Sequence, residues 1–460
     1  MKKVLLTFMV SVCCAASYAQ EVISTEEMTK SISSMEMGTF TRIVSSFPTT
    51  TPTGEDTIMH GAITMNDSVY DKLIVPKGLI LNHQYTITLS NSCATLTENM
   101  IMESGLLSGN IMGVFQGIDN NYIIVSPNNY GFGGEKIDRQ AYLYGDITAK
   151  GALDCLRGAQ TVLADLGYTY GNILASVGYS QGGHSSMATL KLTETDSNYS
   201  DIKFDYVFCG AGPYDIDAIY KQFVAEGSES NYPASIPLIL SNITSMEQLM
   251  GNEVFSNYSD EDLYNEKIAD KITEWYNGNY SINTINNYLF KIYDTEGSVK
   301  VADMLTPEFL DSTTTIAKDY RTILRKNSLV DGWLPSEDNN IYIFHYNEDE
   351  VVPVECSVNM ENYLINSGYK GFLETLYYEP NALERLFGIK THETCGAPFL
   401  NYVSKVLNNA QPTGNINGIE GVKENIKEDN NIYDLFGRKL NEIPQTGIYI
   451  KNKKKISVSQ

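Results

Sequence analysis

The sequence predicts an α/β fold in which a mainly parallel β-sheet carries helices on both faces. Two observations lead to this prediction. Short apolar stretches typical of buried strands alternate with stretches whose apolar residues recur at helical spacing. The 460 residues also suffice for one large domain with an appendage, or for two to three ordinary domains.

The composition excludes several classes of protein. Hydrophobic residues make up 42% of the chain, and 31 Tyr and 16 Phe supply large side chains that disordered chains usually lack. The chain has 33 Lys and Arg residues and 56 Asp and Glu residues, which gives a formal net charge of -23. A charge of this sign repels phosphate backbones and anionic membranes, so we expect no nucleic-acid partner.

The first 19 residues have the pattern of a secretory signal peptide. Lys2 and Lys3 precede an apolar run over residues 4–12, and small residues follow up to Ala19. We therefore predict cleavage after Ala19 and a secreted or cell-surface protein. No transmembrane segment is expected, because no stretch of the chain reaches about 18 uninterrupted apolar residues.

The strands and helices can be placed in order along the chain. Residues 39–47 and 57–65 alternate β-branched with polar residues around a turn, which predicts a hairpin at the front of the sheet, and residues 85–89 are predicted as the third strand. The later predicted strands are 122–125, 173–179, 204–209, 341–345 and 372–377, and the predicted helices are 145–166, 182–193, 354–366 and 396–408.

The alternation lapses between residues 214 and 336. This stretch has helical patches at 244–250, 260–276 and 314–326, and at about 120 residues it is too long for a plain loop. We expect a helical insertion that caps the sheet, which leaves 20–213 and 337–410 as the core. The composition changes again after a Pro-Thr-Gly linker, so residues 416–460 are predicted to form a separate small β module.

The clearest chemical motif is Gly178-Tyr179-Ser180-Gln181-Gly182, a G-x-S-x-G sequence. It follows a predicted strand and opens a predicted helix, and this strand-to-helix turn exposes a nucleophilic serine. Side chains at the two glycines would collide with the neighbouring strand and helix. An ordinary Gly-rich turn is the alternative.

A nucleophilic serine needs a general base and a carboxylate that orients it. The chain has five histidines, and His392 is the one between the last predicted strand and the last predicted helix. Three carboxylates, at residues 348–350, follow the strand predicted at 341–345, and the Val-Val-Pro after Asp349 turns the chain into the next helix. We therefore predict Ser180, Asp349 and His392 as the catalytic residues, whereas His345 is expected to be packed or hydrogen-bonded inside its strand.

These motifs resemble those of α/β-hydrolase fold esterases and lipases, in which the acid loop commonly reads Asp, any residue, Val or Ile, Pro. Together with Gly-Phe-Gly-Gly at 131–134 and Gly-Pro-Tyr-Asp at 212–215, the chain looks like the secretory lipase branch over residues 39–408. The resemblance implies hydrolysis of carboxylic esters through an acyl-enzyme, with a small-molecule, lipid or polysaccharide ester as substrate and an insertion that caps the acyl pocket. It implies no metal and no organic cofactor.

Two backbone N–H groups are expected to form the oxyanion hole. Gln181, directly after the nucleophile, is predicted as the first donor. Such enzymes often place His-Gly after the third strand to supply the second donor, but residues 90–95 of this chain read Ser-Asn-Ser-Cys-Ala-Thr. We therefore assign the second N–H to Cys93, with neighbouring Ser92 as the alternative.

Five cysteines remain after the signal peptide, at positions 93, 155, 209, 356 and 395. No C-x-x-C sequence occurs and the spacings suit no zinc site, so we expect small buried side chains and at most one disulfide.

Residues 432–440 and 447–452, with a Lys-rich end, resemble the sorting domains of type IX secretion. The resemblance implies the secretion machinery as a partner; an accessory carbohydrate-binding module is the alternative for this segment. For the whole chain, a secreted serine peptidase or acyl-aminopeptidase is the second enzyme hypothesis. A surface-binding protein on an inactive hydrolase scaffold is the non-enzyme hypothesis.

Overall fold

The computed structural model describes residues 22–32, 35–95, 121–133 and 140–411, together with four short strands near the C-terminus. For residues 24–40 and the four C-terminal strands only the backbone is described. The predicted signal peptide, residues 1–19, lies outside the described residues. The chain divides into two compact units, Met1–Asn417 and Gly418–Gln460.

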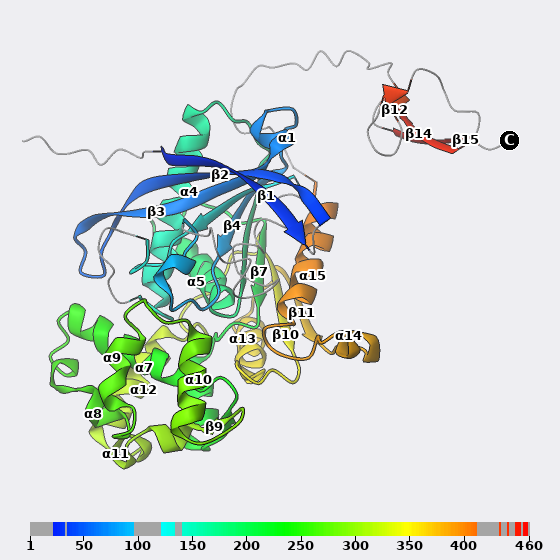
Figure 1. Ribbon diagram of the computed structural model, residues 1–460. Helices are drawn as coiled ribbons and strands as arrows, with labels where there is room; N and C mark the ends of the chain where they lie inside the picture. The colour runs from blue at the N-terminus through cyan, green and yellow to red at the C-terminus, as the bar shows by residue number, and fades with distance from the viewer. Residues whose placement is uncertain are drawn as a thin grey trace, which may run out of the picture. The chain divides into compact units, whose positions relative to one another are not determined.

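The first unit is built on a sheet whose nine described strands lie in the order β1-β2-β3-β5-β4-β6-β7-β10-β11 (Figure 1). The six strands from β5 to β11 in this order are mutually parallel, whereas β1, β2 and β3 are antiparallel. Their bounds are β1 Val22–Ile32, β2 Met35–Thr50, β3 Asp56–Asn66, β4 Gly78–His83, β5 Ile123–Pro127, β6 Ile173–Tyr179, β7 Tyr206–Gly210, β10 Asn340–Tyr346 and β11 Phe372–Tyr378. The predicted mainly parallel sheet and its N-terminal hairpin are confirmed.

The predicted strand at 85–89 is wrong. The strand lies earlier, at β4, whose six residues are all buried between β5 and β6. A strand buried on both faces is continuously apolar rather than alternating, and the run Leu79-Ile80-Leu81 has that character. Residues 85–89 lie beyond the end of β4, and all five line a cavity.

Helices cover both faces of the sheet, as predicted. The helices α4 (Gly145–Asp165), α5 (Gln181–Thr195) and α13 (Glu355–Asn366) pack on one face, and α15 (Gly396–Asn409) packs on the other. Side chains of a strand alternate between the two cores. In β10, Ile341 and Ile343 point to the α13 side, whereas Phe344 packs against Phe399 of α15.

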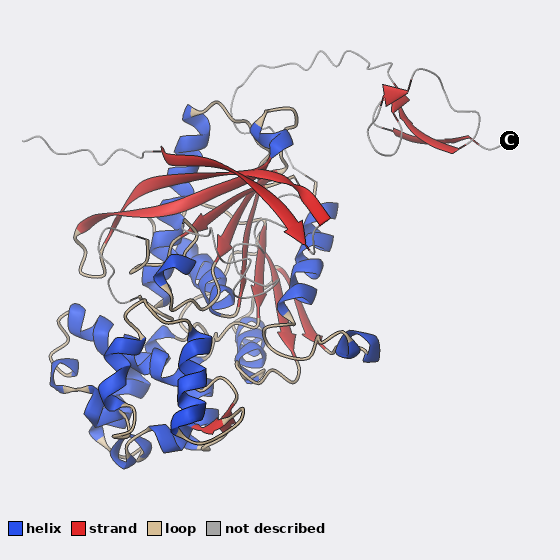
Figure 2. Cartoon of the chain, viewed as in Figure 1, coloured by secondary structure: helices blue, strands red, loops and turns tan. Residues whose placement is uncertain are grey.

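The chain between β7 and β10 folds mainly as helices with a core of their own, and Figure 2 shows them gathered apart from the strands of the sheet. They are α6 Ile216–Ile219, α7 Ser235–Leu249, α8 Asp260–Leu263, α9 Ile272–Trp275, α10 Ile282–Ile292, α11 Pro307–Leu310 and α12 Thr315–Asn327. Each predicted patch coincides with part of a helix, but α10 was not expected from its sequence.

Polar contacts tie this insertion to the core. The side-chain amide of Asn359 in α13 donates a hydrogen bond to the carboxylate of Asp215, the residue before α6, at 2.7 Å. On the other side, the backbone N–H of Ser90 donates to the carbonyl oxygen of Gly278 at 2.8 Å, and the Thr88 hydroxyl donates to the carbonyl oxygen of Tyr280 at 2.7 Å. The loop after β4 is therefore bonded directly to the insertion.

The five cysteines predicted to be buried are buried, and all five are free thiols. The one possible disulfide is therefore absent from the described part of the chain. No helix among the described residues is long and apolar enough to cross a membrane.

The second unit contains a four-stranded antiparallel sheet in the order β13-β12-β14-β15. Its strands are β12 Ile432–Tyr433, β13 Lys439–Leu440, β14 Gly447–Lys451 and β15 Lys454–Val458.

The burial of β10 leads to a stability prediction. Ile343→Ala removes a side chain with 0% exposure and should lower the free energy of unfolding by about 2–5 kcal/mol. The matched control is Ile365→Ala on α13, where the side chain is 58% exposed and the change should stay within about 0.5 kcal/mol. Urea unfolding followed by circular dichroism measures both, and equal losses would contradict this account of the core.

Candidate active site

Ser180 lies in the sharp turn between β6 and α5, with φ 59° and ψ -125°. This left-handed backbone is costly for a residue with a side chain and persists where the surroundings enforce it. The N–H of Ser180 donates to the carbonyl oxygen of Gly210 on β7 at 2.8 Å, and its carbonyl oxygen accepts the N–H of His184 at 3.2 Å. Two backbone hydrogen bonds therefore stabilise the turn, and Ser180 is half-buried.

The two flanking glycines are required by close backbone packing. A Cβ atom on Gly178 would lie 2.0 Å from the carbonyl oxygen of Gly182, and one on Gly182 would lie 2.5 Å from the carbonyl oxygen of His83. The first contact is with the following helix and the second is with the neighbouring strand. The predicted reason for these glycines is confirmed.

Asp349 lies just after β10, and its side chain is fully buried. One carboxylate oxygen accepts the backbone N–H groups of Val351 and Val352, at 2.9 and 2.8 Å. The other accepts the Nδ1–H of His392 at 2.6 Å. The Val-Val segment that follows Asp349 in the sequence thus fixes the orientation of the carboxylate.

His392 connects Asp349 to Ser180. Because Nδ1 donates to the carboxylate, Nε2 carries the lone pair, and it accepts the hydroxyl of Ser180 at 2.8 Å. The backbone carbonyl oxygen of His392 accepts the Tyr179 hydroxyl at 2.7 Å, and the two rings lie 5.1 Å apart. The three residues predicted from the sequence are therefore brought together by two hydrogen bonds.

The other two candidate carboxylates have different partners. Glu348 accepts hydrogen bonds from Arg385 and from the Tyr346 hydroxyl, both at 2.9 Å. Glu350 accepts the backbone N–H of His392, with both carboxylate oxygens at 3.1 Å. Glu350 was a candidate for the catalytic acid, but its contact with the backbone of His392 was not predicted, because a contact with a backbone N–H leaves no motif.

Burial alone would lower the pKa of His392. The negative charges of Asp349, Glu350 and Glu393, of which Asp349 has the largest influence, outweigh burial and raise this pKa above 6.5. Burial would raise the pKa of Asp349. The charge of His392 and the hydrogen bonds of His345 and His392 reverse this, and the pKa is lowered well below its ordinary range. Asp349 is therefore an anion that stabilises the protonated imidazole.

The rings of three other histidines do not hydrogen-bond to Ser180, although Nε2 of one of them, His345, lies 3.4 Å from the Asp349 carboxylate. Burial lowers the pKa of His83 to about 3 and that of His184 to about 4. His345 accepts the Ser357 hydroxyl at 2.6 Å and donates to the carbonyl oxygen of Val352 at 3.0 Å, so its predicted hydrogen-bonded role is confirmed. No group of three or more His, Cys, Asp or Glu side chains suited to a metal ion occurs in the described part of the chain.

The predicted second oxyanion donor, Cys93, is not among the residues that line the cavity beside Ser180, whereas the alternative, Ser92, does line it. Cys93 is fully buried in a small cluster with Ile87 and Phe132. Since β4 ends at His83, the residues that follow the strand are Gln84 and Tyr85 rather than residues 90–95. The carbonyl oxygens of His83 and Gln84 pack against Gly182, which brings this segment next to Ser180.

Gln181, the predicted first donor, begins α5 directly after Ser180. The first N–H groups of a helix have no partner within the helix. Its position therefore suits the predicted role, and the source of a second N–H stays a prediction.

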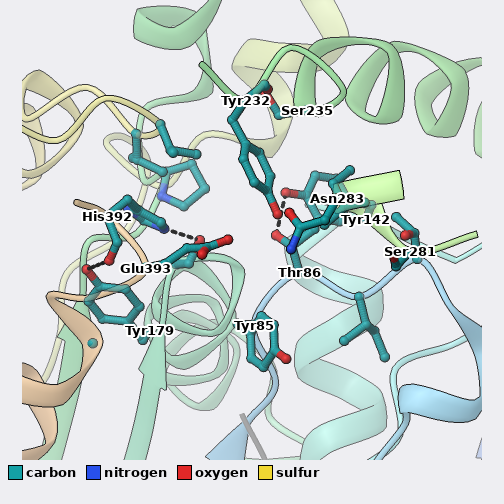
Figure 3. Close-up of a pocket in the computed structure, with 18 of the residues that line it drawn as sticks. Tyr85, Thr86, Tyr142, Tyr179, Tyr232, Ser235, Ser281, Asn283, His392 and Glu393 are labelled. Atoms are coloured by element: carbon teal, nitrogen blue, oxygen red, sulfur yellow. Dashed lines mark hydrogen bonds between the residues drawn. The ribbon is translucent and has the colours of Figure 1, made fainter. Parts of the chain in front are cut away.

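A cavity of about 450 Å³ lies beside Ser180 and His392 (Figure 3). The core lines it with Tyr85, Thr86, Tyr142 and Tyr179, the insertion lines it with Tyr232, Ser235, Ile239, Ser281 and Asn283, and the His392 loop adds Glu393 and Thr394. The hydroxyls of Thr86 and Tyr142 are joined at 2.9 Å across its wall. The insertion thus forms one wall of the cavity.

Comparison with solved structures identifies the fold. The rice cell wall degrading esterase LipA from Xanthomonas oryzae is similar at 18% identity and a TM-score of 0.65, over 84% of this chain and 96% of that one. Candida antarctica lipase A in its closed state is similar at 15% identity and a TM-score of 0.57, over 86% and 83%. The chain has the α/β-hydrolase fold. No family model and no curated protein sequence matches it.

Within this α/β-hydrolase fold, the role of Glu350 can be measured without any substrate. Glu350→Gln removes a negative charge beside His392 and should lower the pKa of the imidazole from its raised value toward 6.5. An NMR titration of the His392 ring protons measures this shift. The control Glu348→Gln, beside Arg385, should leave the titration of His392 nearly unchanged. A pKa at or below 6.5 in the wild type would contradict the electrostatic assignment.

Proposed function

We propose that this protein is a serine hydrolase that cleaves carboxylic esters through an acyl-enzyme. The observation that carries the proposal is the chain of contacts from the Ser180 hydroxyl to His392 Nε2, at 2.8 Å, and from His392 Nδ1 to Asp349, at 2.6 Å. Nucleophile, base and orienting carboxylate are each within hydrogen-bonding distance of the next. The esterase and lipase that share the fold support the same class of reaction.

The proposed reaction has two stages. In the first, Ser180 attacks the ester carbonyl carbon while His392 takes its proton, and His392 then gives that proton to the departing alcohol. In the second, His392 deprotonates a water molecule, which hydrolyses the acyl-enzyme and restores the Ser180 hydroxyl. Asp349 holds the imidazole with Nε2 unprotonated and stabilises the imidazolium that forms at each stage.

Negative charge on the carbonyl oxygen is stabilised by backbone N–H groups in this proposal. Gln181 supplies one of them at the start of α5, and the segment after His83 supplies the other. The cavity beside Ser180 receives the substrate, and its wall from the insertion sets the substrate choice. The proposed substrate is a small-molecule, lipid or polysaccharide ester.

Two competing hypotheses can be separated by simple assays. An acyl-aminopeptidase would cleave aminoacyl anilides faster than matched esters. A surface-binding protein on an inactive scaffold would cleave neither and would not be labelled by a fluorophosphonate, which reacts with activated serines. Ester cleavage together with labelling at Ser180 would support the proposed hydrolase.

The proposal leads to a prediction for the three residues. Ser180→Ala and His392→Ala should lower kcat for a 4-nitrophenyl ester by about 10⁴- to 10⁶-fold, and Asp349→Asn by about 10⁴-fold, with the unfolding transition retained. The control Glu348→Gln should keep most of the activity, because its carboxylate contacts Arg385 rather than His392. An inactive Glu348→Gln beside an active Asp349→Asn would refute the assignment of the acid.

We also propose that the C-terminal unit directs export and that the mature protein lies at the cell surface or in the medium. The division at Asn417 and the separate antiparallel sheet of the second unit support an independent module. A chain ending at residue 411 should keep full esterase activity but remain in the periplasm of its native host. Mass spectrometry of cell fractions tests this, and loss of activity or an unchanged location would favour an accessory domain.

A further inference from the structure

One ionisable group in the cavity takes no part in the bond making and breaking of the proposed reaction. Glu393 follows His392 in the sequence and lines the cavity, and its side chain is exposed rather than packed. In Figure 3 the Glu393 side chain extends from the His392 loop toward the centre of the cavity. The pKa of Tyr232, on the wall formed by the insertion, is raised mainly by burial and next by the charge of Glu393. The carboxylate therefore interacts electrostatically with that wall.

The charge of this carboxylate is not balanced by a Lys or Arg in the described lining of the cavity. Among the described residues that line the cavity there is no Lys or Arg, and Glu393 is the one carboxylate. The chain as a whole carries a formal charge of -23, which adds a negative field of longer range. An anionic substrate would therefore approach against the charge of the protein.

The remaining walls suit a cation. The rings of Tyr85, Tyr142 and Tyr232 line the cavity around the position to which Glu393 extends. Aromatic rings attract ammonium groups through their electron-rich faces, and they do so most strongly where water is excluded. A carboxylate attracts an ammonium group by its charge, and neighbouring tyrosine rings add to that attraction.

We propose that Glu393 selects ester substrates by charge, favouring those that bear an ammonium group and rejecting those that bear a carboxylate. This inference rests on the proposed ester hydrolysis and adds the substrate class to it. Glu393 acts as a specificity residue, because the bonds that form and break do not involve its carboxylate.

The test compares three 4-nitrophenyl esters of similar length, whose acyl chains end in a trimethylammonium group, a methyl group or a carboxylate. The wild type should show the highest kcat/KM for the cationic ester and the lowest for the anionic one. Glu393→Gln should reduce the cationic-to-anionic ratio by about tenfold, and Glu393→Lys should invert the preference. High salt should also lower the wild-type ratio, since a Debye length of about 3 Å at 1 M screens this charge.

Glu350→Gln is the matched control. It removes a carboxylate that contacts the backbone of His392 but does not line the cavity, so it should change all three rates together and leave their ratio unchanged. A wild-type ratio at or below one, or an unchanged ratio in Glu393→Gln, would overturn charge selection while ester hydrolysis stood. Absence of cleavage for all three esters would instead refute the proposed function itself.

Discussion

The left-handed backbone of Ser180 is the constraint on which the rest of the site depends. It places the serine beyond the end of β6. It persists because the N–H of Ser180 is bonded to Gly210 and because Gly178 and Gly182, which lack a Cβ atom, allow the backbone to pack closely around the turn. The same close packing brings the segment after His83 against the turn. Nucleophile and proposed N–H donors are therefore positioned by one piece of backbone packing.

The second part of the site is an electrostatic arrangement. Asp349 is buried as an anion because two backbone N–H groups and His392 satisfy its oxygens. Its charge, with those of Glu350 and Glu393, more than offsets the effect of burial on the pKa of His392. The imidazole therefore remains basic enough to accept a proton, although burial alone would lower its pKa.

Local patterns in the sequence were enough to predict much of this arrangement. The G-x-S-x-G motif, the Asp349-Glu350-Val351 turn and the position of His392 between the last strand and the last long helix each depend on neighbours in sequence. The misplaced third strand shows where such reasoning fails. Residues 85–89 line a cavity and lie outside the sheet, and a cavity is formed by segments far apart in the chain. Cys93 was predicted as a donor because the third strand was expected at 85–89, whereas β4 ends at His83.

Other site features depend wholly on tertiary packing. The contact of Glu350 with a backbone N–H and the direction of the Glu393 side chain follow from where the loop after β10 meets the loop before α15. Neither has a signature in residue type or spacing. The α10 helix was missed for a related reason: its apolar face packs within the insertion, and its Asn-rich sequence is a weak helix former on its own.

The five buried thiols have a practical consequence. No disulfide links the described residues, so this part of the chain loses no covalent cross-link in a reducing cytosol. Its recombinant production in the cytosol therefore requires no oxidative folding. Burial also keeps these sulfurs from reagents in water, and it raises the pKa of Cys209 to about 12, so little thiolate is present. The rate at which a maleimide dye labels the native protein therefore reports how often its core opens.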